Sequence, residues 1–349
     1  MGEILGIGTT HYPGLVGVDT NLAGLVRTIM QDPGLPERYR DPANWPPEMR
    51  AEYGDDGGAA SAKQHRAAIV SHFRRAREEL DRFQPDVVII FGDDQYENFR
   101  EDIIPPFCVE AYDEIVTRPF AHRQGANAWG EPQDTEFRYK GNREAGKYLT
   151  RRLLEQDIDA AYAYQPAHDA LSHAFTNTLL FLDYDRKGFP YAVLPFQVNC
   201  YGSKVISQRG GRRALSDPAR EGDLDPPSPS PSRCMQVGAA VARAMRESPW
   251  TAALVASSSW SHAFLVDKNY QLHPDTPADR RLFEALSGGN YDVWRQTPLS
   301  SFVESGEQEM LNWAMLAGAM DALGRKPDVC EFVQSWIFNS NKVFAVFRP

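Results

Sequence analysis

The chain has 349 residues, of which 42% are hydrophobic and 24% are charged, and its formal net charge at pH 7 is -10. This length allows one large α/β domain or two closely packed lobes, and the composition is typical of soluble globular proteins. The negative charge, without any run of Lys and Arg, argues against a nucleic-acid partner. No apolar run approaches the length of a membrane span, so we expect no membrane partner.

The four cysteines form no metal-binding or disulfide pattern. Cys108, Cys200, Cys234 and Cys330 are far apart, and no pair has CxxC or CxxxC spacing. Neither a zinc ribbon nor a disulfide framework is therefore indicated. The first residues, MGEILGIGTTHYPG, lack the basic segment and the long apolar segment of a signal peptide. We expect a reducing, cytoplasmic location.

The first predicted strand covers residues 3–8 and ends in a polar loop that contains His11. A histidine on the loop that leaves a strand, held by Pro and Gly, is placed like a ligand or a catalytic group. A loop histidine bonded to the backbone is the alternative. Apolar residues then recur at helical spacing over 62–83, which predicts an amphipathic helix.

The next strand is predicted from the run of five apolar residues Val87 to Phe91, which reads as a strand buried on both faces. A glycine is expected to end it, and Asp93, Asp94 and Gln95 follow at its carboxyl end. Ligands bind at that edge in open α/β sheets, so polar groups there are candidates for chemistry. A turn capped by aspartates is the alternative.

Two further histidines lie between predicted elements in the middle of the chain. Residues 118–141 are predicted to be a polar loop, and 143–156 a helix. A short strand then leads to His168 and His173, which are five residues apart and precede an apolar helical run. A role in core packing is the alternative for either histidine.

The remaining elements continue the order of helix, apolar strand and polar strand-end loop. Predicted strands at 191–198 and 252–257 are each followed by polar residues, and His262 lies in the second of these loops. Asp275 precedes a helix and reads most simply as its N-cap. Further predicted elements are helices at 234–246, 278–286 and 307–323 and one or two strands within 332–347.

This order predicts an α/β fold in which one sheet, flanked by helices, carries a site on its strand-end loops. Irregular insertions are expected at about 31–60 and 203–233, where Pro and Gly are frequent. The second insertion lies between a strand and a helix, so it is a loop and not a domain linker. We therefore expect one domain over residues 1–349.

The candidate ligands and catalytic groups on these loops are His11, Asp94, Gln95, His168, His173, His262 and Asp275. Two imidazoles and one carboxylate with open positions form the arrangement that non-haem Fe(II) enzymes use to bind substrate and O₂. Neither a G-x-S-x-G nucleophile elbow nor a G-x-x-x-x-G-K-[ST] phosphate loop is present to compete with this interpretation.

The chain resembles the class III extradiol ring-cleavage dioxygenases, the LigB-like superfamily of the catalytic subunit of protocatechuate 4,5-dioxygenase. The resemblance covers nearly the whole chain. It rests on the segments GTTHYPGL, PDVVIIFGDDQYENF, LSHAFTNTLLFL, LPFQVNC, PPSPSPSRC, SSSWSH and ESGEQEMLNWAMLAGAM, which occur in that order. It implies a LigB-like fold, a single large domain with a central mixed sheet flanked by helices.

The resemblance also implies roles for individual residues. His11 matches the first iron-ligand histidine, and His173 matches a catalytic histidine that shuttles protons beside the metal. Gln95 stands where the family has its second ligand histidine, so Gln95 or Asp94 is the expected ligand there. A neutral amide is a weaker ligand for Fe(II) than an imidazole. The third family ligand is a glutamate before a helix, for which Asp275 is the nearest acid.

Two positions near these ligands leave alternatives open. His273 competes with Asp275 for the third ligand position, and Asn142 stands where the family has another active-site histidine.

The sequence thus predicts a dioxygenase that uses Fe(II), or another divalent metal, to open a catechol-like or aminophenol-like ring with O₂. His173 is the expected acid and base, and His262 and His168 would bond the substrate or the oxygen. The alternative is a LigB-like protein without this activity, either a binding protein or a metal-dependent hydrolase or isomerase, because Gln95 replaces a histidine. We expect a homodimer, and a small accessory subunit is possible.

Overall fold

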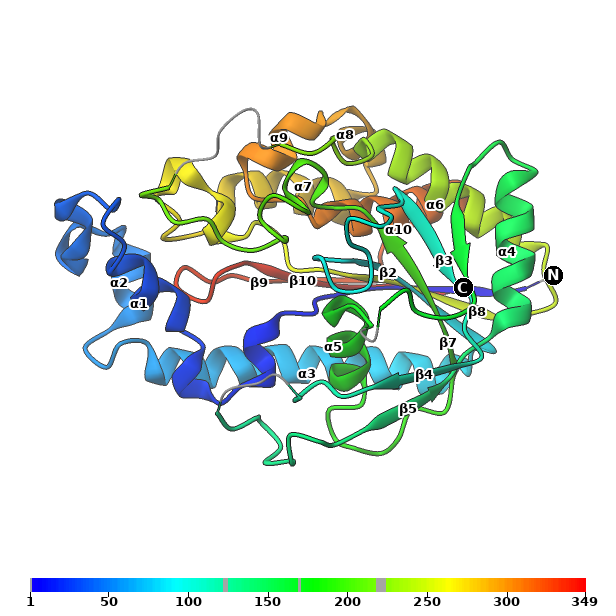
Figure 1. The fold of residues 1–349 in the computed structure, drawn as a ribbon, viewed down its shortest axis with the longest axis horizontal. Coiled ribbons are helices and arrows are strands. Elements are labelled where there is room, and N and C mark those ends of the chain that lie inside the picture. The colour runs from blue at the N-terminus through cyan, green and yellow to red at the C-terminus, as the bar shows by residue number, and fades with distance from the viewer. Residues whose placement is uncertain (1, 122–124, 169–170, 218–223) are drawn as a thin grey trace.

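The computed structural model describes residues 2–121, 125–168, 171–217 and 224–349. Its centre is an eight-stranded mixed sheet with the strand order β6-β3-β7-β2-β8-β1-β10-β9. The expected α/β fold, a mixed sheet flanked by helices, is confirmed (Figure 1). The strands of this sheet are β1 (Ile4–Thr9), β2 (Val87–Asp93), β3 (Phe107–Glu110), β6 (Ala161–Ala163), β7 (Ala192–Val198), β8 (Ala252–Ser257), β9 (Val329–Val333) and β10 (Lys342–Phe347).

The four middle strands, β7, β2, β8 and β1, run parallel to one another. Ile89 of β2 lies opposite Leu194 of β7 on one side and Leu254 of β8 on the other. Every residue of β2 is buried, as expected for a parallel strand covered on both faces. The carboxyl ends of β1, β2 and β8 therefore meet at one edge of the sheet.

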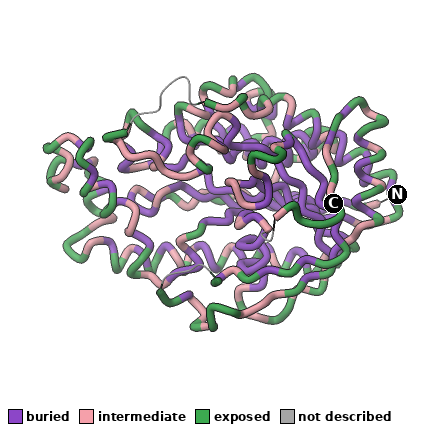
Figure 2. The backbone as a smooth tube through the Cα atoms, viewed as in Figure 1, coloured by how far each residue is buried: buried purple, intermediate pink, exposed green. Residues whose placement is uncertain are grey.

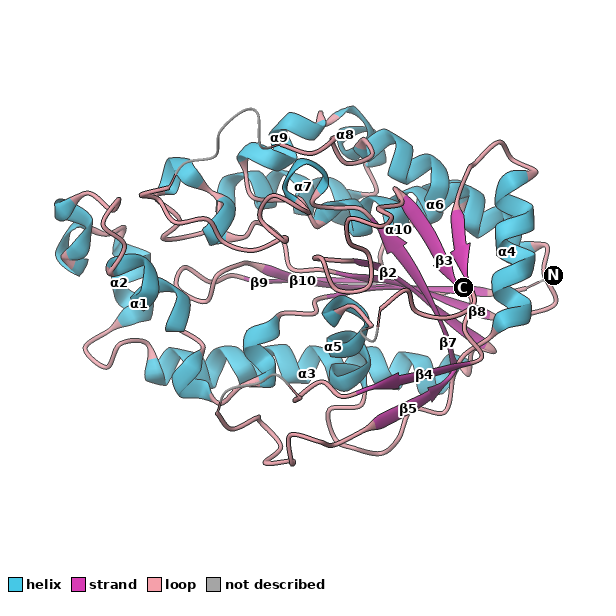
Figure 3. Ribbon diagram, viewed as in Figure 1, coloured by secondary structure: helices cyan, strands magenta, loops and turns pink. Residues whose placement is uncertain are grey.

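Helices cover both faces of the sheet (Figure 3). The long helix α3 and the helix α5 pack against one face, and α6 and α10 pack against the other. Figure 2 shows the buried backbone running through the middle of the molecule between these layers. The helices are α1 (Gly24–Met30), α2 (Pro47–Tyr53), α3 (Ala59–Phe83), α4 (Arg143–Leu154), α5 (His173–Leu182), α6 (Pro231–Arg246), α7 (Thr276–Gly288), α8 (Tyr291–Gln296), α9 (Leu299–Glu304) and α10 (Met310–Ala322).

Helices α6 and α10 touch through their backbones. A Cβ atom on Gly238 of α6 would overlap the carbonyl oxygen of Met315, and one on Gly318 of α10 would overlap that of Met235. Only glycine allows such an approach at these two positions. Helix α10, which follows Glu309, is therefore packed closely against α6.

Two predictions of local structure are wrong. Gly92 does not end its strand, because β2 continues through Gly92 to Asp93. A Cβ at position 92 would come within 2.7 Å of the Phe175 ring of α5, so this glycine is required by packing. The predicted loop at 118–141 contains strand β5 (Phe137–Lys140), which pairs with β4 (Glu114–Thr117) in a separate antiparallel sheet.

The insertion expected at 31–60 contains α2 and two short 3-10 turns. Part of the other insertion, 218–223, lies outside the described residues. Within the described ranges, no helix combines the length and the apolar character needed to cross a bilayer.

Candidate metal centre

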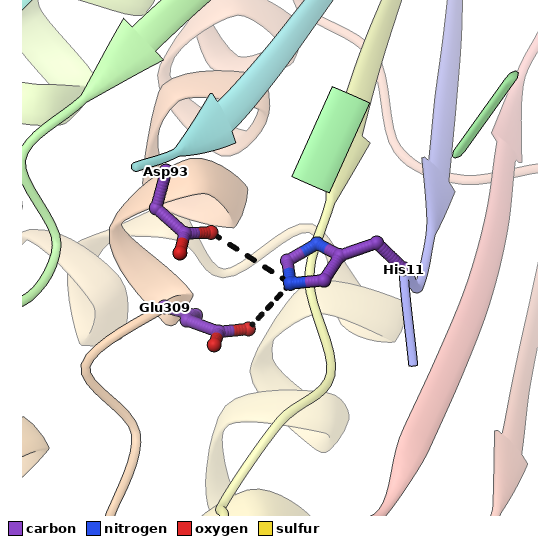
Figure 4. Close-up of side chains that lie close together, drawn as sticks. All are labelled: His11, Asp93 and Glu309. Carbon is purple, nitrogen blue, oxygen red and sulfur yellow. Dashed lines mark ion pairs between the residues drawn. The ribbon is translucent and has the colours of Figure 1, made fainter. Parts of the chain in front are cut away.

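A cluster of one histidine and two carboxylates lies where β1, β2 and β8 end. His11 follows β1, Asp93 is the last residue of β2, and Glu309 immediately precedes α10. One ligand atom from each residue lies within 4.8 Å of the other two. Figure 4 shows both carboxylates pointing toward the same edge of the His11 ring. His11 Nε2 is 3.2 Å from Glu309 Oε2 and 3.8 Å from Asp93 Oδ1.

A backbone carbonyl group fixes the tautomer of His11. Its Nδ1 lies 2.9 Å from the carbonyl oxygen of Ser257, and a carbonyl can only accept, so Nδ1 carries the proton of a neutral ring. The lone pair of Nε2 then faces Asp93 and Glu309. Burial disfavours a charged His11, but the two carboxylates outweigh burial and raise its pKa. The two carboxylates therefore favour a positive charge next to Nε2, either on a protonated His11 ring or on a bound cation.

The two carboxylates differ in their surroundings. Burial and the negative charge of Glu309 raise the pKa of Asp93 to about 6. Glu309 is equally buried, yet the nearby imidazoles of His262 and His11 lower its pKa below the ordinary value. Its Oε1 accepts hydrogen bonds from the Tyr201 hydroxyl at 2.6 Å and from Gln95 Nε2 at 3.1 Å. Glu309 is thus the carboxylate that stays ionised.

The donor set fits a divalent cation. Glu309 Oε2 is buried, and His11 Nε2 and His262 Nε2 face it at 3.2 and 3.4 Å. A buried carboxylate is costly unless a positive charge neutralises it, and these two imidazoles with the two carboxylates offer a cation a set of nitrogen and oxygen ligands. One imidazole with two carboxylates suits Fe(II), Mn(II) or Zn(II).

Gln95 lies beside this cluster, but the structure gives its amide another role. Its Nε2 donates to Asp93 Oδ2 at 3.1 Å, to Glu309 Oε1 at 3.1 Å and to the Tyr201 hydroxyl at 3.0 Å. The side chain therefore joins the two carboxylates and holds them in place. The hydrogen-bond network assigns the amide nitrogen, and not the oxygen, to this side.

The other two predicted acids are not brought to the cluster. The Asp94 carboxylate accepts from the backbone N–H groups of Glu97, Asn98 and Phe99, so it caps the turn after β2, the alternative that the sequence left open. Asp275 is the N-cap of α7 and forms an ion pair with Lys268.

The competing candidate for the third ligand position is also placed elsewhere. His273 Nδ1 lies 3.0 Å from the carbonyl oxygen of Pro274 and its ring packs against Trp336.

His173 lies next to the cluster at the start of α5. Its ring centre is 5.0 Å from that of His11, in an edge-to-face arrangement. Glu97 Oε1 accepts from the His173 backbone N–H at 2.9 Å and lies 3.0 Å from Nδ1. Burial works against the charged ring, but Glu97 outweighs it and raises the pKa of His173 to about 10. The ring is thus oriented by Glu97, with Nε2 as its other polar atom.

The two other candidate histidines occupy different surroundings. His262 is buried at the cluster, where burial lowers its pKa and its Nε2 lies 3.4 Å from Glu309 Oε2. His168 lies at the surface, 3.3 Å from Asp102, and its side chain is 32% exposed. The structure therefore brings His11, His173 and His262 together and leaves His168 apart.

Sequence reasoning did not name Asp93, Glu309 or Glu97 as ligands or catalytic groups. Asp93 was placed among the polar residues at the end of its strand, but Asp94 and Gln95 were named as ligands in its place. Glu309 follows Glu307 and Gln308 just before a largely apolar helix, and this polar run was the available signal. Glu97 offered no signal, because nothing in its local pattern points toward His173.

The geometry of these side chains by itself indicates the class of site. A buried centre of His11, Asp93 and Glu309, with the ion pair of His173 and Glu97 beside it, is typical of an enzyme that combines a divalent metal with acid and base chemistry. It lies at the carboxyl edge of a largely parallel sheet, where ligands bind in such folds.

Comparison with known proteins shows which metal-dependent enzymes this chain resembles. Residues 224–345 match the family model described as the catalytic LigB subunit of aromatic ring-opening dioxygenase. The resemblance to the LigB-like extradiol dioxygenases is confirmed, as is the expectation of an oxidoreductase of the extradiol dioxygenase type.

Several curated relatives match over most of their length, and each is named as a 2,3-dihydroxyphenylpropionate/2,3-dihydroxicinnamic acid 1,2-dioxygenase. The protein from Burkholderia vietnamiensis (strain G4 / LMG 22486) is 25% identical over 275 residues, which are 72% of this chain and 80% of the relative. The one from Paraburkholderia phymatum is 26% identical over 271 residues, or 72% and 80%. The one from Paraburkholderia xenovorans (strain LB400) is 24% identical over 320 residues, or 82% and 85%.

Proposed function

We propose that this chain is a metal-dependent dioxygenase that opens the ring of a catechol-like substrate with O₂. The observation that carries the proposal is the buried centre of His11, Asp93 and Glu309 with His173 beside it. The named relatives act on dihydroxyphenyl acids, which supports a catechol as the substrate class. An aminophenol, in which one ring hydroxyl is an amine, is a second substrate of the same geometry.

His11, Glu309 and Asp93 would hold the metal, with Fe(II) as the proposed ion. When bound, Fe(II) supplies open coordination positions for adjacent substrate oxygens and for O₂. Tyr201 and Gln95 fix the Glu309 carboxylate through its other oxygen. Such supporting hydrogen bonds orient ligands and tune the affinity of the site.

His173 would hold and move the proton of the substrate hydroxyl. Glu97 orients the ring through Nδ1, which leaves Nε2 to exchange the proton. Burial disfavours the charged His173 ring, whereas Glu97 and then Asp93 and Glu309 raise its pKa. A bound cation would offset the charge of Asp93 and Glu309 and so lower this pKa toward neutrality, where an imidazole is an effective acid and base. His262 would bond the substrate or the oxygen from the other side of Glu309.

Anaerobic loading with Fe(II), followed by addition of O₂ and a panel of catechols, tests this proposal. We expect ring opening, seen as a new absorption band and as O₂ uptake. Binding of neither metal nor catechol would contradict the proposal. Stoichiometric zinc without O₂ uptake would instead favour a metal-dependent hydrolase or isomerase, an alternative that the named relatives do not favour.

Assembly is also part of the proposal. A homodimer is the expected state, and activity of the purified chain alone would dispense with an accessory subunit. Light scattering of the loaded protein measures the first, and the same catechol assay measures the second.

A further inference from the structure

A cavity of about 570 Å³ opens beside the proposed metal centre. This volume is in the range of pockets that hold small organic ligands. His173 and Asn177 line it, and both also contact His11. The His173 ring packs against the His11 ring, and Asn177 Nδ2 donates to the carbonyl oxygen of His11 at 3.0 Å. The cavity therefore adjoins the centre through His173 and Asn177.

The walls of this cavity are amphipathic. Val116, Pro119 and Leu171 supply apolar surface. Thr117 and Thr176 supply hydroxyl groups, whose oxygens are 3.2 Å apart. Such a lining suits a small aromatic molecule that carries a polar group.

Two arginines line the cavity, and only one of them has a carboxylate partner. Arg118 Nη2 donates to Glu136 at 2.6 Å. Arg100 donates from Nε to the carbonyl oxygen of Glu97 at 3.2 Å and lies 5.7 Å from the centre of the Tyr96 ring. No ion pair joins Arg100 to a carboxylate anywhere in the described ranges. The charge of Glu101 acts on Arg100, but the guanidinium forms no ion pair with a described residue at the wall of the cavity.

The carboxylates nearest to Arg100 are already occupied. Glu97 accepts from the backbone N–H of His173 and pairs with its ring. Glu101 accepts the Tyr96 hydroxyl on both oxygens, at 2.7 and 2.6 Å. An anion that enters the cavity therefore meets a fork of donors that no protein carboxylate is using.

We propose that Arg100 determines substrate specificity by binding the carboxylate of an anionic catechol, one whose side chain ends in a carboxylate. This inference rests on the proposed function and names its substrate class. Guanidinium groups bind carboxylates through two parallel hydrogen bonds, which fixes orientation as well as charge. The diol would lie at the centre beside His173, and the side chain would extend between the apolar walls toward Arg100.

The test compares an acid with a neutral catechol of similar length, 2,3-dihydroxyphenylpropionate and 3-propylcatechol, on the Fe(II)-loaded full chain. We expect Arg100→Gln to raise KM for the acid roughly 10- to 100-fold, the range for loss of a charged hydrogen bond, with little change in kcat. The neutral catechol should be opened with unchanged KM. Arg100→Lys keeps the charge but loses the fork, so it should recover part of the affinity for the acid.

Arg209→Gln is the matched control. Arg209 lies over the same Tyr96 ring, with 4.9 Å to its centre, and it is not among the residues that line the cavity. This variant should leave both KM values within about twofold. Equal losses for acid and neutral catechol in R100Q would overturn the inference, and so would a selective loss in Arg118→Gln in place of R100Q.

The two proposals fail in different ways. Opening of both catechols without preference for the acid would refute the role of Arg100 and leave the dioxygenase proposal standing. If no catechol is opened, anaerobic binding titrations of the acid and the neutral catechol still decide the inference. Wild type must then bind the acid more tightly than R100Q does, and equal dissociation constants would refute it.

Discussion

Two glutamates at the sheet are equally buried and yet have opposite properties. Glu309, before α10, and Glu110, the last residue of β3, are each 1% exposed. Histidines around Glu309 lower its pKa, whereas burial and the nearby Asp94 raise the pKa of Glu110 to about 8. Hydrogen bonds from Asn98 and Tyr112 offset only part of this rise. Imidazole neighbours, and not exposure, therefore decide which of the two buried carboxylates is ionised and can bind a cation.

Among the substitutions considered, Glu309→Gln is expected to have the largest effect, because it removes the difference in charge between Glu309 and Glu110. The variant keeps the shape of the side chain but removes the charge that a cation needs. We expect the affinity for Fe(II) to fall roughly 100-fold or more, beyond what loss of a supporting hydrogen bond costs, and ring opening to be lost. Calorimetric titration with Fe(II) under argon measures the first effect. Glu110→Gln is the matched control, and a similar loss of metal in that variant would contradict the assignment.

A large effect on turnover is expected from His173→Gln. The change removes the group proposed to exchange the substrate proton, so kcat should fall about 10²- to 10⁴-fold, the usual contribution of such a group. Metal affinity should change little, because His173 is not one of the three proposed ligands. Stopped-flow kinetics and metal analysis on the same sample separate the two. Parallel loss of metal would place His173 among the ligands.

Glu110 is expected to make stability depend on pH. Its folded pKa of about 8 lies above the ordinary value of 4.5, so the folded state binds this proton more tightly. The stabilisation is complete below pH 4.5 and is lost as the pH rises toward 8. Glu110→Gln should remove this dependence of the free energy of unfolding on pH. At pH 8 the variant should be more stable than wild type by at most a few kcal/mol, the upper bound from the linkage relation. Urea unfolding between pH 5 and pH 8 measures the difference, and parallel curves would refute the shift.

The smallest effect is expected from Gln95→His. An imidazole at this position adds a possible ligand, but it removes the amide that donates to Asp93 and Glu309. We expect the preference for Fe(II) over Mg(II) to rise about tenfold, because imidazole suits iron better than it suits magnesium. Competitive metal titration measures the ratio. An unchanged ratio would show that position 95 does not reach the metal.

The sequence predicted the order of elements well because its strands are buried on both faces. The strand at 252–257 has the predicted limits, since continuous apolar runs are unambiguous when polar loops bound them. The three histidines His11, His173 and His262 also lie close together in the structure. Parallel strands that end at one sheet edge made that placement predictable.

The carboxylates could not be predicted in the same way. Side chains alternate along a strand, and Val87, Ile89 and Phe91 face the core beneath α10. Asp93 continues this alternation toward Glu309 only if the strand runs through Gly92, a point that depends on the packing of Phe175. Glu309 comes from a helix more than 200 residues away, and no local pattern records which strand that helix covers.

The contact between α6 and α10 affects how the protein responds to removal of the metal and to storage. Because Gly238 and Gly318 bring the two helix backbones together, the residue that precedes α10 has little freedom to drift while the core is intact. If the proposed Fe(II) is removed with a chelator, the site should keep its shape, and addition of Fe(II) should restore activity without refolding. Loss of activity on storage would then reflect oxidation of the proposed ion, which reductant and fresh Fe(II) would repair.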